Sequence, residues 1–341
     1  MIIKILLSPF SFLFYIISFI YHKFHDLFSK SAFSPKTSSI SVGNLSIGGT
    51  GKTPMVMWLA DFLLPTHNLL ILSRGYGRKS KGFLEVKENM TFIETGDEPL
   101  AYKKMLGDKI KVAVCEKRKD GVDEMLSRYP NTNCILLDDA FQHRSINPGL
   151  SILLTTYSSP FYSDYPLPSG SLREPSIGAH RADIIIVTKC PEDIPQTKKK
   201  EFINSLNRFK KPIFFSNIKY DKIQSLYKEV NNIDSILLVT GIANPSPLFT
   251  YLEKRYKVIH LKYSDHYSFT KNDIKEIHQK FNNFASSKMV ILTTEKDLVR
   301  LCKYESETQM KNYPWYKISI SLDFDDTKGL KKIIENYVRQ N

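Results

Sequence analysis

The sequence predicts an α/β protein, in which a mainly parallel sheet flanked by helices is preceded by a hydrophobic helix and followed by a second, smaller α/β domain. Three observations lead to this prediction. Short apolar runs alternate with helical patterns, a glycine-rich loop joins the first run to the first helix of the sheet, and residues 2–21 are almost entirely apolar. Apolar strands separated by helices are typical of a parallel sheet covered on both faces.

The amino terminus is expected to contact a membrane. Lys4 is the only charged residue from Ile2 to Tyr21, and about 20 helical residues span the roughly 30 Å of a bilayer's hydrocarbon core. A cleaved signal peptide fits less well, because no small-x-small cleavage site follows. Pro9 and scattered aromatic residues suit either a kinked span or an anchor in the interface. By the positive-inside rule, the lysines that follow predict a cytoplasmic location for the remainder: Lys23, Lys30 and Lys36.

A glycine-rich loop follows the first apolar run and is expected to bind a nucleotide phosphate. Residues 41–54 read SVGNLSIGGTGKTP, and the expected phosphate-binding residues are Gly48, Gly49, Thr50, Gly51, Lys52, Thr53 and Pro54. Glycines let several backbone N–H groups point at one anion, Lys52 adds a positive charge, and Thr53 offers a hydroxyl to Mg²⁺. Ser46 stands where the strict P-loop pattern has glycine. A plain glycine turn would leave Lys52 and Thr53 unexplained, so we predict a P-loop NTPase-like core.

The remaining apolar runs define the two predicted α/β units. In the first unit the expected strands lie at 40–42, 69–73, 110–114, 134–137, 152–154, 184–187 and 213–215. A polar stretch from 219 to 234 follows, and the alternation then restarts with strands at 236–239, 258–261, 289–292 and 318–322. The predicted division is a hydrophobic helix over 1–28, a P-loop NTPase-like core over 29–222, and a smaller α/β domain over 223–341.

Two acids end the strand that begins at Cys134. Asp138 and Asp139 have the form of a Walker B element, whose carboxylates bind Mg²⁺ directly or through water beside the P-loop. The alternative is a helix cap formed by two aspartates. Gln142 and His143 follow at once, and they are expected either to orient a substrate or nucleophile or to be structural loop residues.

Other polar clusters follow predicted strands and are candidates for the ligand-binding edge of the sheet. Each of them is also explained by an ordinary turn or a solvated charge. These clusters are SRGYGR (73–78), GDEP (96–99), RKDG (118–121), LREP (172–175) and Asp265-His266.

Composition restricts the classes of partner. The 341 residues carry a formal net charge of +13, which favours an acidic partner such as nucleic acid, anionic lipid or a phosphorylated substrate. The lysines are dispersed and no nucleic-acid motif is present, so we expect no nucleic-acid partner. The four cysteines form no CxxC pair, which argues against zinc and disulfides and favours a reducing, cytosolic setting. Nothing in the sequence indicates an obligate protein partner.

Taken together, the motifs resemble the tetraacyldisaccharide 4'-kinases. SVGNLSIGGTGKTP, SRGYGR, GDEP, RKDG, DDAFQHR, LREP, RADIIIVTK, SDHYSF and TEKD occur in the order of that family, and Ser46 fits the family's version of the P-loop. Two residues depart from the family pattern, since Ala140 replaces the usual glycine and Tyr267 a usual histidine; the LPSGSLRE loop also differs slightly. The resemblance implies ATP-dependent phosphorylation of the 4'-hydroxyl of a membrane-embedded acylated glucosamine disaccharide 1-phosphate in lipid A biosynthesis. It also implies ATP and Mg²⁺ as cofactors and a place at the cytoplasmic face of the bacterial inner membrane, in contact with its lipid.

The resemblance also assigns roles to residues. Asp97 and His266 correspond to a catalytic pair that accepts the proton of the 4'-hydroxyl, and they lie in different predicted domains, so domain closure would assemble them. Lys52 and Asp139 complete the expected catalytic set, with Thr53, Asp138 and Asp139 at the metal. The expected substrate contacts are Arg74, Tyr76, Arg78, Arg118, His143, Arg173 and Glu174. Asp297 of TEKD is expected either to contact adenine or ribose or to be an ordinary loop residue.

Two further functions stay open on the sequence alone. A membrane-associated P-loop switch or motor ATPase would share the loop and the acidic strand end, with Gln142 positioning water. A basic membrane-surface adaptor with a degenerate P-loop would share only the charge and the apolar amino terminus. Rapid hydrolysis without an acceptor would favour the switch, and undetectable binding of ATP and Mg²⁺ would favour the adaptor.

Overall fold

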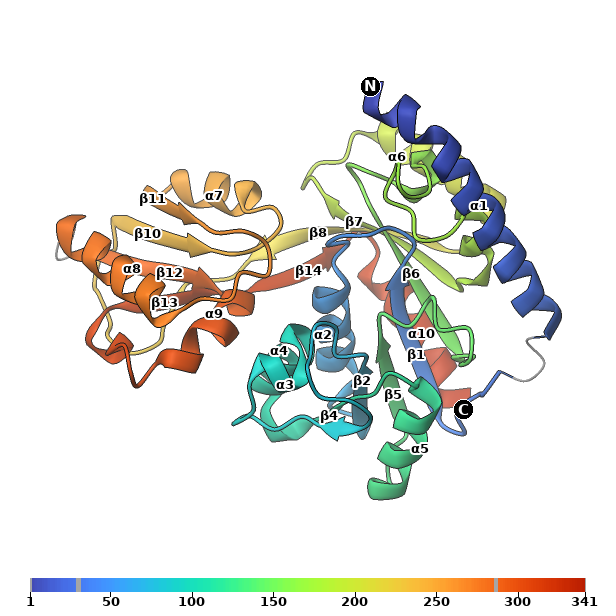
Figure 1. Cartoon of the computed structure of the whole chain (residues 1–341), viewed down its shortest axis with the longest axis horizontal. Coiled ribbons are helices and arrows are strands. Elements are labelled where there is room, and N and C mark those ends of the chain that lie inside the picture. Colours follow the sequence, from blue (N-terminus) through green and yellow to red (C-terminus); the bar gives the residue numbers. More distant parts are fainter. Residues whose placement is uncertain (1, 29–31, 285–287, 341) are drawn as a thin grey trace.

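The computed structural model describes residues 2–28, 32–284 and 288–340, and within them the strands form one nine-stranded sheet and one five-stranded sheet (Figure 1). The strand that precedes the glycine-rich loop, β1, lies at the centre of the large sheet, whose order is β14-β8-β7-β6-β1-β5-β2-β4-β3. Its neighbours β5 and β6 are parallel to it, and only the edge strands β3 and β14 are antiparallel to their neighbours. The predicted α/β class and mainly parallel sheet are therefore confirmed.

Seven strands of the large sheet lie at predicted runs, and all of these except β2 differ from the predicted run in length. β2 has the predicted bounds, whereas β8 extends beyond the predicted run to Tyr220, and the short edge strand β3 was not predicted. The strands are β1 Ser38–Asn44, β2 Leu69–Ser73, β3 Leu84–Glu85, β4 Lys111–Val114, β5 Cys134–Asp138, β6 Leu150–Thr156, β7 Ile184–Cys190, β8 Ile213–Tyr220 and β14 Ile320–Phe324.

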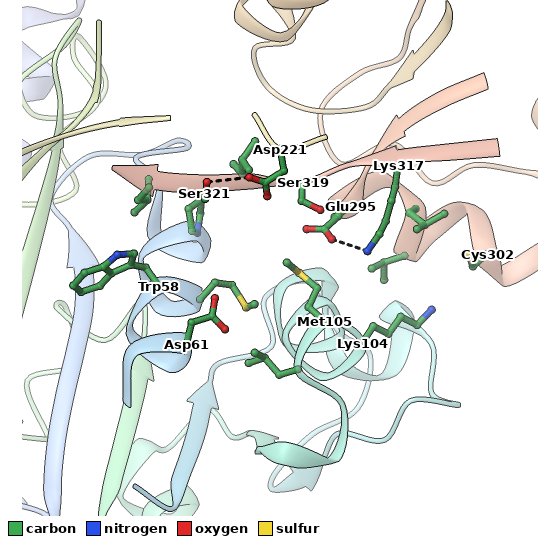
Figure 2. Close-up of a pocket in the computed structure, with 17 residues that line it drawn as sticks. Trp58, Asp61, Lys104, Met105, Asp221, Glu295, Cys302, Lys317, Ser319 and Ser321 are labelled. Atoms are coloured by element: carbon green, nitrogen blue, oxygen red, sulfur yellow. Dashed lines mark hydrogen bonds and ion pairs between the residues drawn. The ribbon is translucent and has the colours of Figure 1, made fainter. Parts of the chain in front are cut away.

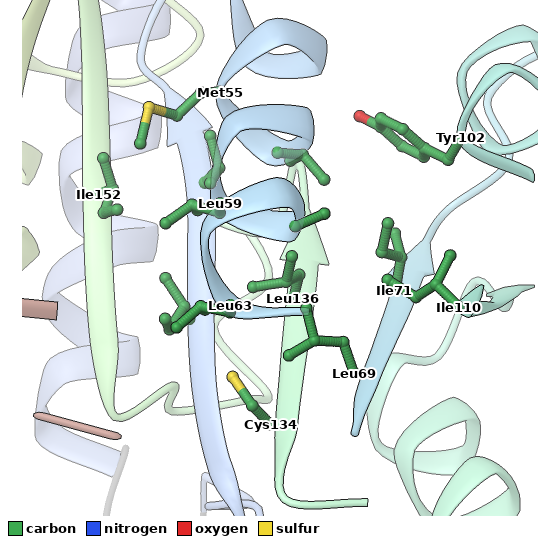
Figure 3. Packing of buried hydrophobic residues seen from close by; sticks show 14 of the residues in the cluster. Met55, Leu59, Leu63, Leu69, Ile71, Tyr102, Ile110, Cys134, Leu136 and Ile152 are labelled. Atoms are coloured by element: carbon green, nitrogen blue, oxygen red, sulfur yellow. The ribbon is translucent and has the colours of Figure 1, made fainter. Parts of the chain in front are cut away.

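Helices cover both faces of this sheet, as the buried strands require. In β5, Leu136 packs in the cluster with Leu59 of α2 (Figure 3). Its neighbour Leu137 points to the other face and packs in the cluster with Met125 of α5. Every residue of β5 is buried, which explains why the strand reads as a continuous apolar run. The helices of this part are α2 Lys52–Leu63, α3 Phe92–Thr95, α4 Asp97–Leu106, α5 Arg118–Arg128, α6 Gln196–Leu206 and α10 Thr327–Gln340. Short 3₁₀ turns lie at Gly107–Lys109, Phe161–Ser163, Ser176–Arg181 and Asn207–Phe209.

The small sheet has the order β11-β10-β12-β13-β9 and is parallel except for β9. Alternate residues of β10 face opposite helices, with Leu237 packed in the cluster of α8 and Leu238 in the cluster of α7. Its strands are β9 Gln224–Ser225, β10 Ser235–Thr240, β11 Lys257–Lys262, β12 Met289–Thr294 and β13 Trp315–Ile318. Its helices are α7 Ser246–Glu253, α8 Lys271–Phe284 and α9 Glu295–Leu301, with 3₁₀ turns at Cys302–Tyr304 and Met310–Asn312.

The predicted single strand over 318–322 is wrong. Ile318 ends β13 in the small sheet, and after Ser319 the chain enters β14, which pairs with β8 in the large sheet. The chain passes between the two sheets twice, after β8 and again between β13 and β14. These two connections are hydrogen-bonded to each other, because Asp221 donates its backbone N–H to the Ser319 carbonyl at 3.0 Å. β14 and α10 thus return to the large sheet, although our division of the chain assigns them to the smaller domain. The domain boundaries themselves stay a prediction.

The amino-terminal helix, α1 (Ile2–Phe28), lies along the outside of the large unit (Figure 1). Its polar side chains hold it there. Ser11 hydrogen-bonds Ser169 through the two hydroxyls at 2.5 Å, and His22 Nε2 lies 3.3 Å from Glu174 Oε2. Many of its apolar side chains face outward, among them Phe10, Leu13, Ile17, Ile20 and Phe24. Among the described residues, we find no helix whose length and apolarity suffice to cross a membrane.

Candidate active site

The glycine-rich loop connects the end of β1 to the start of α2, as the sequence predicts. Gly51 caps α2 with φ +94° and ψ +23°, a left-handed conformation that is accessible to glycine and strained for other residues. Thr188 at the end of β7 donates its hydroxyl to the Thr50 carbonyl at 2.7 Å and so fixes the loop to the sheet. The first backbone N–H groups of a helix have no partner within it, so Lys52 and Thr53 open α2 with amides suited to an anion.

Lys52 lies in a polar cluster with Asp139 and Arg173. Its Nζ is 3.5 Å from both Asp139 Oδ1 and the side-chain oxygen of Asn44, the last residue of β1. Arg173 contacts the same two residues and approaches Asp139 Oδ1 at 3.1 Å. Burial acts to raise the pKa of Asp139, but Lys52 and Arg173 outweigh it, so the pKa is lowered. Three predicted site residues therefore meet at the mouth of the loop, joined by Asn44, which we had not predicted.

Asp138 differs from its neighbour. Its side chain is buried at the end of β5, where Oδ2 accepts a hydrogen bond from the Ser73 hydroxyl at 3.0 Å. Burial, together with the charges of Glu98 and Asp139, raises the pKa of Asp138 to about 7. Within the described part of the chain, Oδ1 is fully buried and has no hydrogen-bond partner. Such an oxygen costs free energy unless a cation or a water satisfies it.

Asp97 and His266 come together across the two units. Asp97 is the first residue of α4 beside the large sheet, and His266 lies in the loop between β11 and α8 of the small one. The distance from His266 Nδ1 to Asp97 Oδ2 is 2.8 Å. Burial acts to raise the pKa of Asp97, but hydrogen bonds from His266 and Arg300 and their charges lower it to about 2. Asp97 is therefore ionised at neutral pH.

Arg300 of α9 is a member of this cluster that the sequence analysis missed. Its side chain is fully buried, and Nη2 donates to Asp97 Oδ2 at 2.6 Å. Nη1 lies 3.2 Å from Asp297 Oδ1. Asp297 is itself buried and accepts from the Gly241 backbone N–H at 3.0 Å, so it supports Arg300 inside the small unit. The sequence carried no signal for Arg300, because an arginine near the end of a short helix also suits a solvated surface.

The loop that carries Arg74 and Tyr76 packs against the start of α4. A Cβ on Gly96 would lie 3.1 Å from both the backbone of Gly75 and the Tyr76 carbonyl, so SRGYGR and GDEP require glycine where they meet. The Tyr76 side chain is 82% exposed, and Arg74 is exposed as well. Arg78 is instead turned inward, where Nη2 pairs with Glu116 Oε1 at 2.7 Å.

The other expected substrate residues occupy different environments. Arg118 is fully buried and donates to the carbonyls of Cys115 at 2.6 Å and Asp138 at 3.2 Å, and burial lowers its pKa to about 10. Glu174 is also fully buried and accepts from Arg181 at 2.8 Å. His143 lies beside the acidic pair, where burial and nearby arginines lower its pKa to about 4. Arg118 and Glu174 therefore support the site from within.

A cavity of about 400 Å³ lies on another side of the junction between the two units. Figure 2 shows Asp61 of α2, Met105 of α4 and the Glu295–Lys317 ion pair around it, and Trp58 of α2 also contributes to its lining. Pro54 is the only predicted site residue in its lining among the residues described. The chemistry expected of the chain therefore lies at the strand ends and at the α4–α9 contact, outside this cavity.

Comparison with known proteins gives one consistent result. A family model described as "LpxK: Tetraacyldisaccharide-1-P 4'-kinase" matches residues 3–339. A tetraacyldisaccharide 4'-kinase of Flavobacterium psychrophilum is 42% identical over 310 residues, 89% of this chain and 87% of the relative. One from Flavobacterium johnsoniae is 37% identical over 346 residues, 100% and 98% of the two chains. A crystal structure of the "apo" form of LpxK from Aquifex aeolicus in complex with ATP is similar with a TM-score of 0.75 and 28% identity, covering 98% of this chain and 99% of that one.

Proposed function

The chain belongs to the tetraacyldisaccharide-1-phosphate 4'-kinase family, and from this premise we propose how its residues divide the work of phosphoryl transfer. As a member of this family it is a kinase that phosphorylates the lipid A precursor disaccharide, so the comparisons do not favour a switch or motor ATPase. One observation carries the proposal. Asp97 and His266, 169 residues apart, form a 2.8 Å pair that joins the unit of the phosphate-binding loop to the smaller unit.

The loop at residues 48–54 is the proposed site for the phosphates of ATP. The Aquifex relative, which covers nearly the whole chain, was crystallised in complex with ATP. In this chain the loop combines the helix N-terminus with Lys52, whose Nζ lies 3.5 Å from Asp139. A bound phosphate would replace Asp139 as the partner of Lys52. Lys52 would then stabilise the charge that develops on the transferring group.

The residues at the end of β5 fit a magnesium ion. Asp138 Oδ1 is a buried, unpartnered carboxylate oxygen among the described residues, and carboxylate oxygens are ligands that Mg²⁺ prefers. The described part of the chain holds no group of three or more acidic, His or Cys side chains placed to hold a metal. That suits Mg²⁺ at a kinase site, where substrate phosphates and waters supply most ligands. Asp138, Asp139 and Thr53 would hold the ion, which neutralises phosphate charge when bound.

Asp97 is the proposed base for the 4'-hydroxyl. In the transfer, the 4' oxygen forms a bond to the γ-phosphorus as the bond to the β–γ bridging oxygen breaks, and the hydroxyl proton passes to Asp97. His266 orients the carboxylate through Oδ2. No hydrogen bond to Oδ1 comes from the described residues, so that oxygen is the one that can accept the proton. General-base help of this kind is worth roughly 10² to 10⁴ in rate.

Four of the expected substrate residues are placed to reach a sugar or phosphate. Arg74 and Tyr76 are exposed beside Gly96, and His143 and Arg173 lie at the acidic strand end. Arginine suits bidentate recognition of a phosphate group. Because Arg78, Arg118 and Glu174 are engaged with protein partners, we propose that they shape this surface rather than contact the disaccharide.

The outer face of α1 is the proposed contact with the cytoplasmic side of the inner membrane. Phe10, Ile17, Ile20 and Phe24 are each more than half exposed, and they recur at the spacing of one helix face. The opposite face is held to the protein through Ser11 and His22. A helix with one apolar face out and a tethered polar face in suits a position in the interface. Sedimentation with anionic vesicles tests this: Phe10→Ser with Phe24→Ser should weaken binding. Phe284→Ser, which alters an exposed aromatic residue at the end of α8 in the small unit, should not.

The function is tested by transfer of labelled γ-phosphate to the acylated disaccharide 1-phosphate in detergent micelles. Wild-type protein should transfer label only when acceptor and Mg²⁺ are present, and Asp97→Ala should be severely impaired. No transfer by the wild type, or full activity of Asp97→Ala, would contradict the proposal. Arg255→Ala, an exposed change on the far side of the small unit, is the matched control and should keep wild-type activity.

A further inference from the structure

Arg300 forms a buried link between the proposed base and the small unit. Its side chain is fully buried, and its guanidinium group contacts both Asp97 of α4 and Asp297 of its own helix. Buried arginines are rare and are found paired, because an isolated buried charge is very costly. A buried arginine therefore needs a carboxylate partner, and Arg300 has two, Asp97 and Asp297.

The distances favour Asp97 as the functional partner. Arg300 Nη2 donates to Asp97 Oδ2 at 2.6 Å, whereas Nη1 divides its contacts between Asp297 Oδ1 at 3.2 Å and the Gly241 carbonyl at 3.3 Å. Asp297 has other donors, since it accepts from the Gly241 N–H and from the Thr294 hydroxyl at 2.8 Å. The contact of Nη1 with Asp297 fixes the orientation of the guanidinium group, and this orientation directs Nη2 at Asp97.

The contact also determines which oxygen of Asp97 is free. His266 Nδ1 and Arg300 Nη2 both converge on Oδ2, at 2.8 and 2.6 Å, and they lie 3.2 Å from each other. Both donors belong to the small unit, and Asp97 belongs to the large one. A base that must meet a hydroxyl needs a fixed orientation, because a misplacement of about 1 Å can cost on the order of 10²-fold in rate.

Resting on the proposed role of Asp97 as the base, we propose that Arg300 is a positioning residue for this reaction: through its contact with Oδ2 it holds the Asp97 carboxylate turned with Oδ1 toward the acceptor hydroxyl. Arg300 does not touch the reacting atoms. It acts through Asp97 alone, and this distinguishes it from a residue that merely holds α9 against α4.

A double-mutant cycle separates these two roles, since coupled residues give non-additive effects. Arg300→Met should lower kcat about 10- to 100-fold while KM for ATP changes little. In an Asp97→Asn background the same change should cost less than about 3-fold, because the carboxylate it positions is already gone. Val299→Ala is the matched control: it loosens packing of the same helix in the cluster that contains Leu100 of α4, and its effect should be equal in both backgrounds.

A conservative variant and a titration of Asp97 itself keep the test decisive if Arg300→Met folds poorly. Arg300→Lys keeps the charge but loses the fork, so it should recover part of kcat. Loss of the positive charge should raise the pKa of Asp97 in Arg300→Met, read from the chemical shift of its carboxyl carbon against pH, and Arg300→Lys should leave that pKa near the wild-type value. The charged groups around Asp97 that stay constant across the series are His266, Lys296, Glu98, Asp265 and Asp297.

Each outcome decides something. Non-additive losses together with a raised pKa of Asp97 in Arg300→Met support the proposal. Equal losses in the wild-type and Asp97→Asn backgrounds, or an unchanged pKa of Asp97 in Arg300→Met, would show a purely structural arginine. If the wild-type protein itself transfers no phosphate, the proposed function fails first; if it is active and Arg300→Met is as active, only the role of Arg300 fails.

Discussion

The carboxylates at two places in this site, Asp97 at the start of α4 and Asp138 at the end of β5, respond to burial in opposite ways. Both are largely buried, which by itself raises a carboxyl pKa. Asp97 meets two donors from the small unit and its pKa falls to about 2. Asp138 lies near two other acids, Lys52 and the Ser73 hydroxyl offset burial and these acids only in part, and its pKa rises to about 7. The difference teaches that partners, more than burial, decide the charge of an acid here. Acids whose pKa values are shifted in opposite directions by their surroundings are typical of functional sites.

The largest expected effect comes from removing the charge of the paired acid. Asp97→Asn keeps the shape of the side chain but cannot accept the hydroxyl proton, so kcat should fall roughly 10² to 10⁴-fold. Initial rates of labelled phosphate transfer measure this. KM for ATP should stay near the wild-type value, because Asp97 contacts none of the loop residues. A variant that retains more than a tenth of kcat would remove Asp97 from the role of base.

Removing the other charge should stabilise the protein. Because the folded pKa of Asp138 is raised from 3.8 to about 7, its contribution favours the folded state fully below pH 3.8 and is lost as pH rises through 7. The asparagine in the variant Asp138→Asn cannot ionise, so the variant keeps the stability that the wild type loses. The free energy of unfolding of Asp138→Asn should therefore exceed that of the wild type by an amount that grows with pH, to about 4 kcal/mol at pH 8. Urea unfolding without Mg²⁺ at pH 5 and pH 8 measures it. An advantage that is equal at both pH values would contradict the raised pKa.

The paired acid should show the opposite sign in the same assay. The folded pKa of Asp97 is lowered from 3.8 to about 2, so its contribution is present above pH 3.8 and is lost as pH falls toward 2. Asp97→Asn should therefore lower the free energy of unfolding by about 2 kcal/mol at pH 5, and this cost should shrink as the pH falls toward 2. Asp123→Asn, which breaks an exposed pair with Lys119, is the control and should cost less than about 1 kcal/mol. A cost that stays the same between pH 5 and pH 3 would contradict the lowered pKa of Asp97.

The two acids also differ in how far the sequence could reveal them. Asp138 ends an apolar strand that follows the glycine-rich loop in the chain, and the carboxyl ends of parallel strands share an edge, so spacing alone suggested a metal-binding acid. Asp97 has no such local signal and was found only through the family resemblance, because its partner His266 is far away in the chain. Neither spacing nor the family resemblance indicated Arg300, because its role depends on the contact of α4 with α9.

The fold shows the same limit. Local apolar runs predicted ten of the fourteen strands in the described residues, and most of these ten are largely buried. They missed β3 and β9 and merged β13 with β14. They did not predict where the chain changes sheets. Ile318 and Ile320 are separated by a single serine, and only tertiary pairing places the first in the small sheet and the second beside β8. Glu174 was expected at the substrate for a related reason: a charged residue in a loop gives no sign that arginine and histidine partners enclose it.

The smallest expected effect tests the far side of the Asp97 pair. His266 Nδ1 must carry a proton to donate to Asp97 at 2.8 Å, and in the tautomer with its proton there Nε2 accepts from Lys296, whose Nζ lies 3.3 Å away. Lys296→Met should therefore lower kcat only about 3-fold, on the scale of about 0.7 kcal/mol for one partly exposed contact. Lys317→Met, which breaks the Glu295 pair beside the cavity, is the matched control and should leave kcat unchanged. Nitrogen chemical shifts of His266 that place the proton on Nε2 in the wild type would reverse this assignment, because Lys296 would then face a donor.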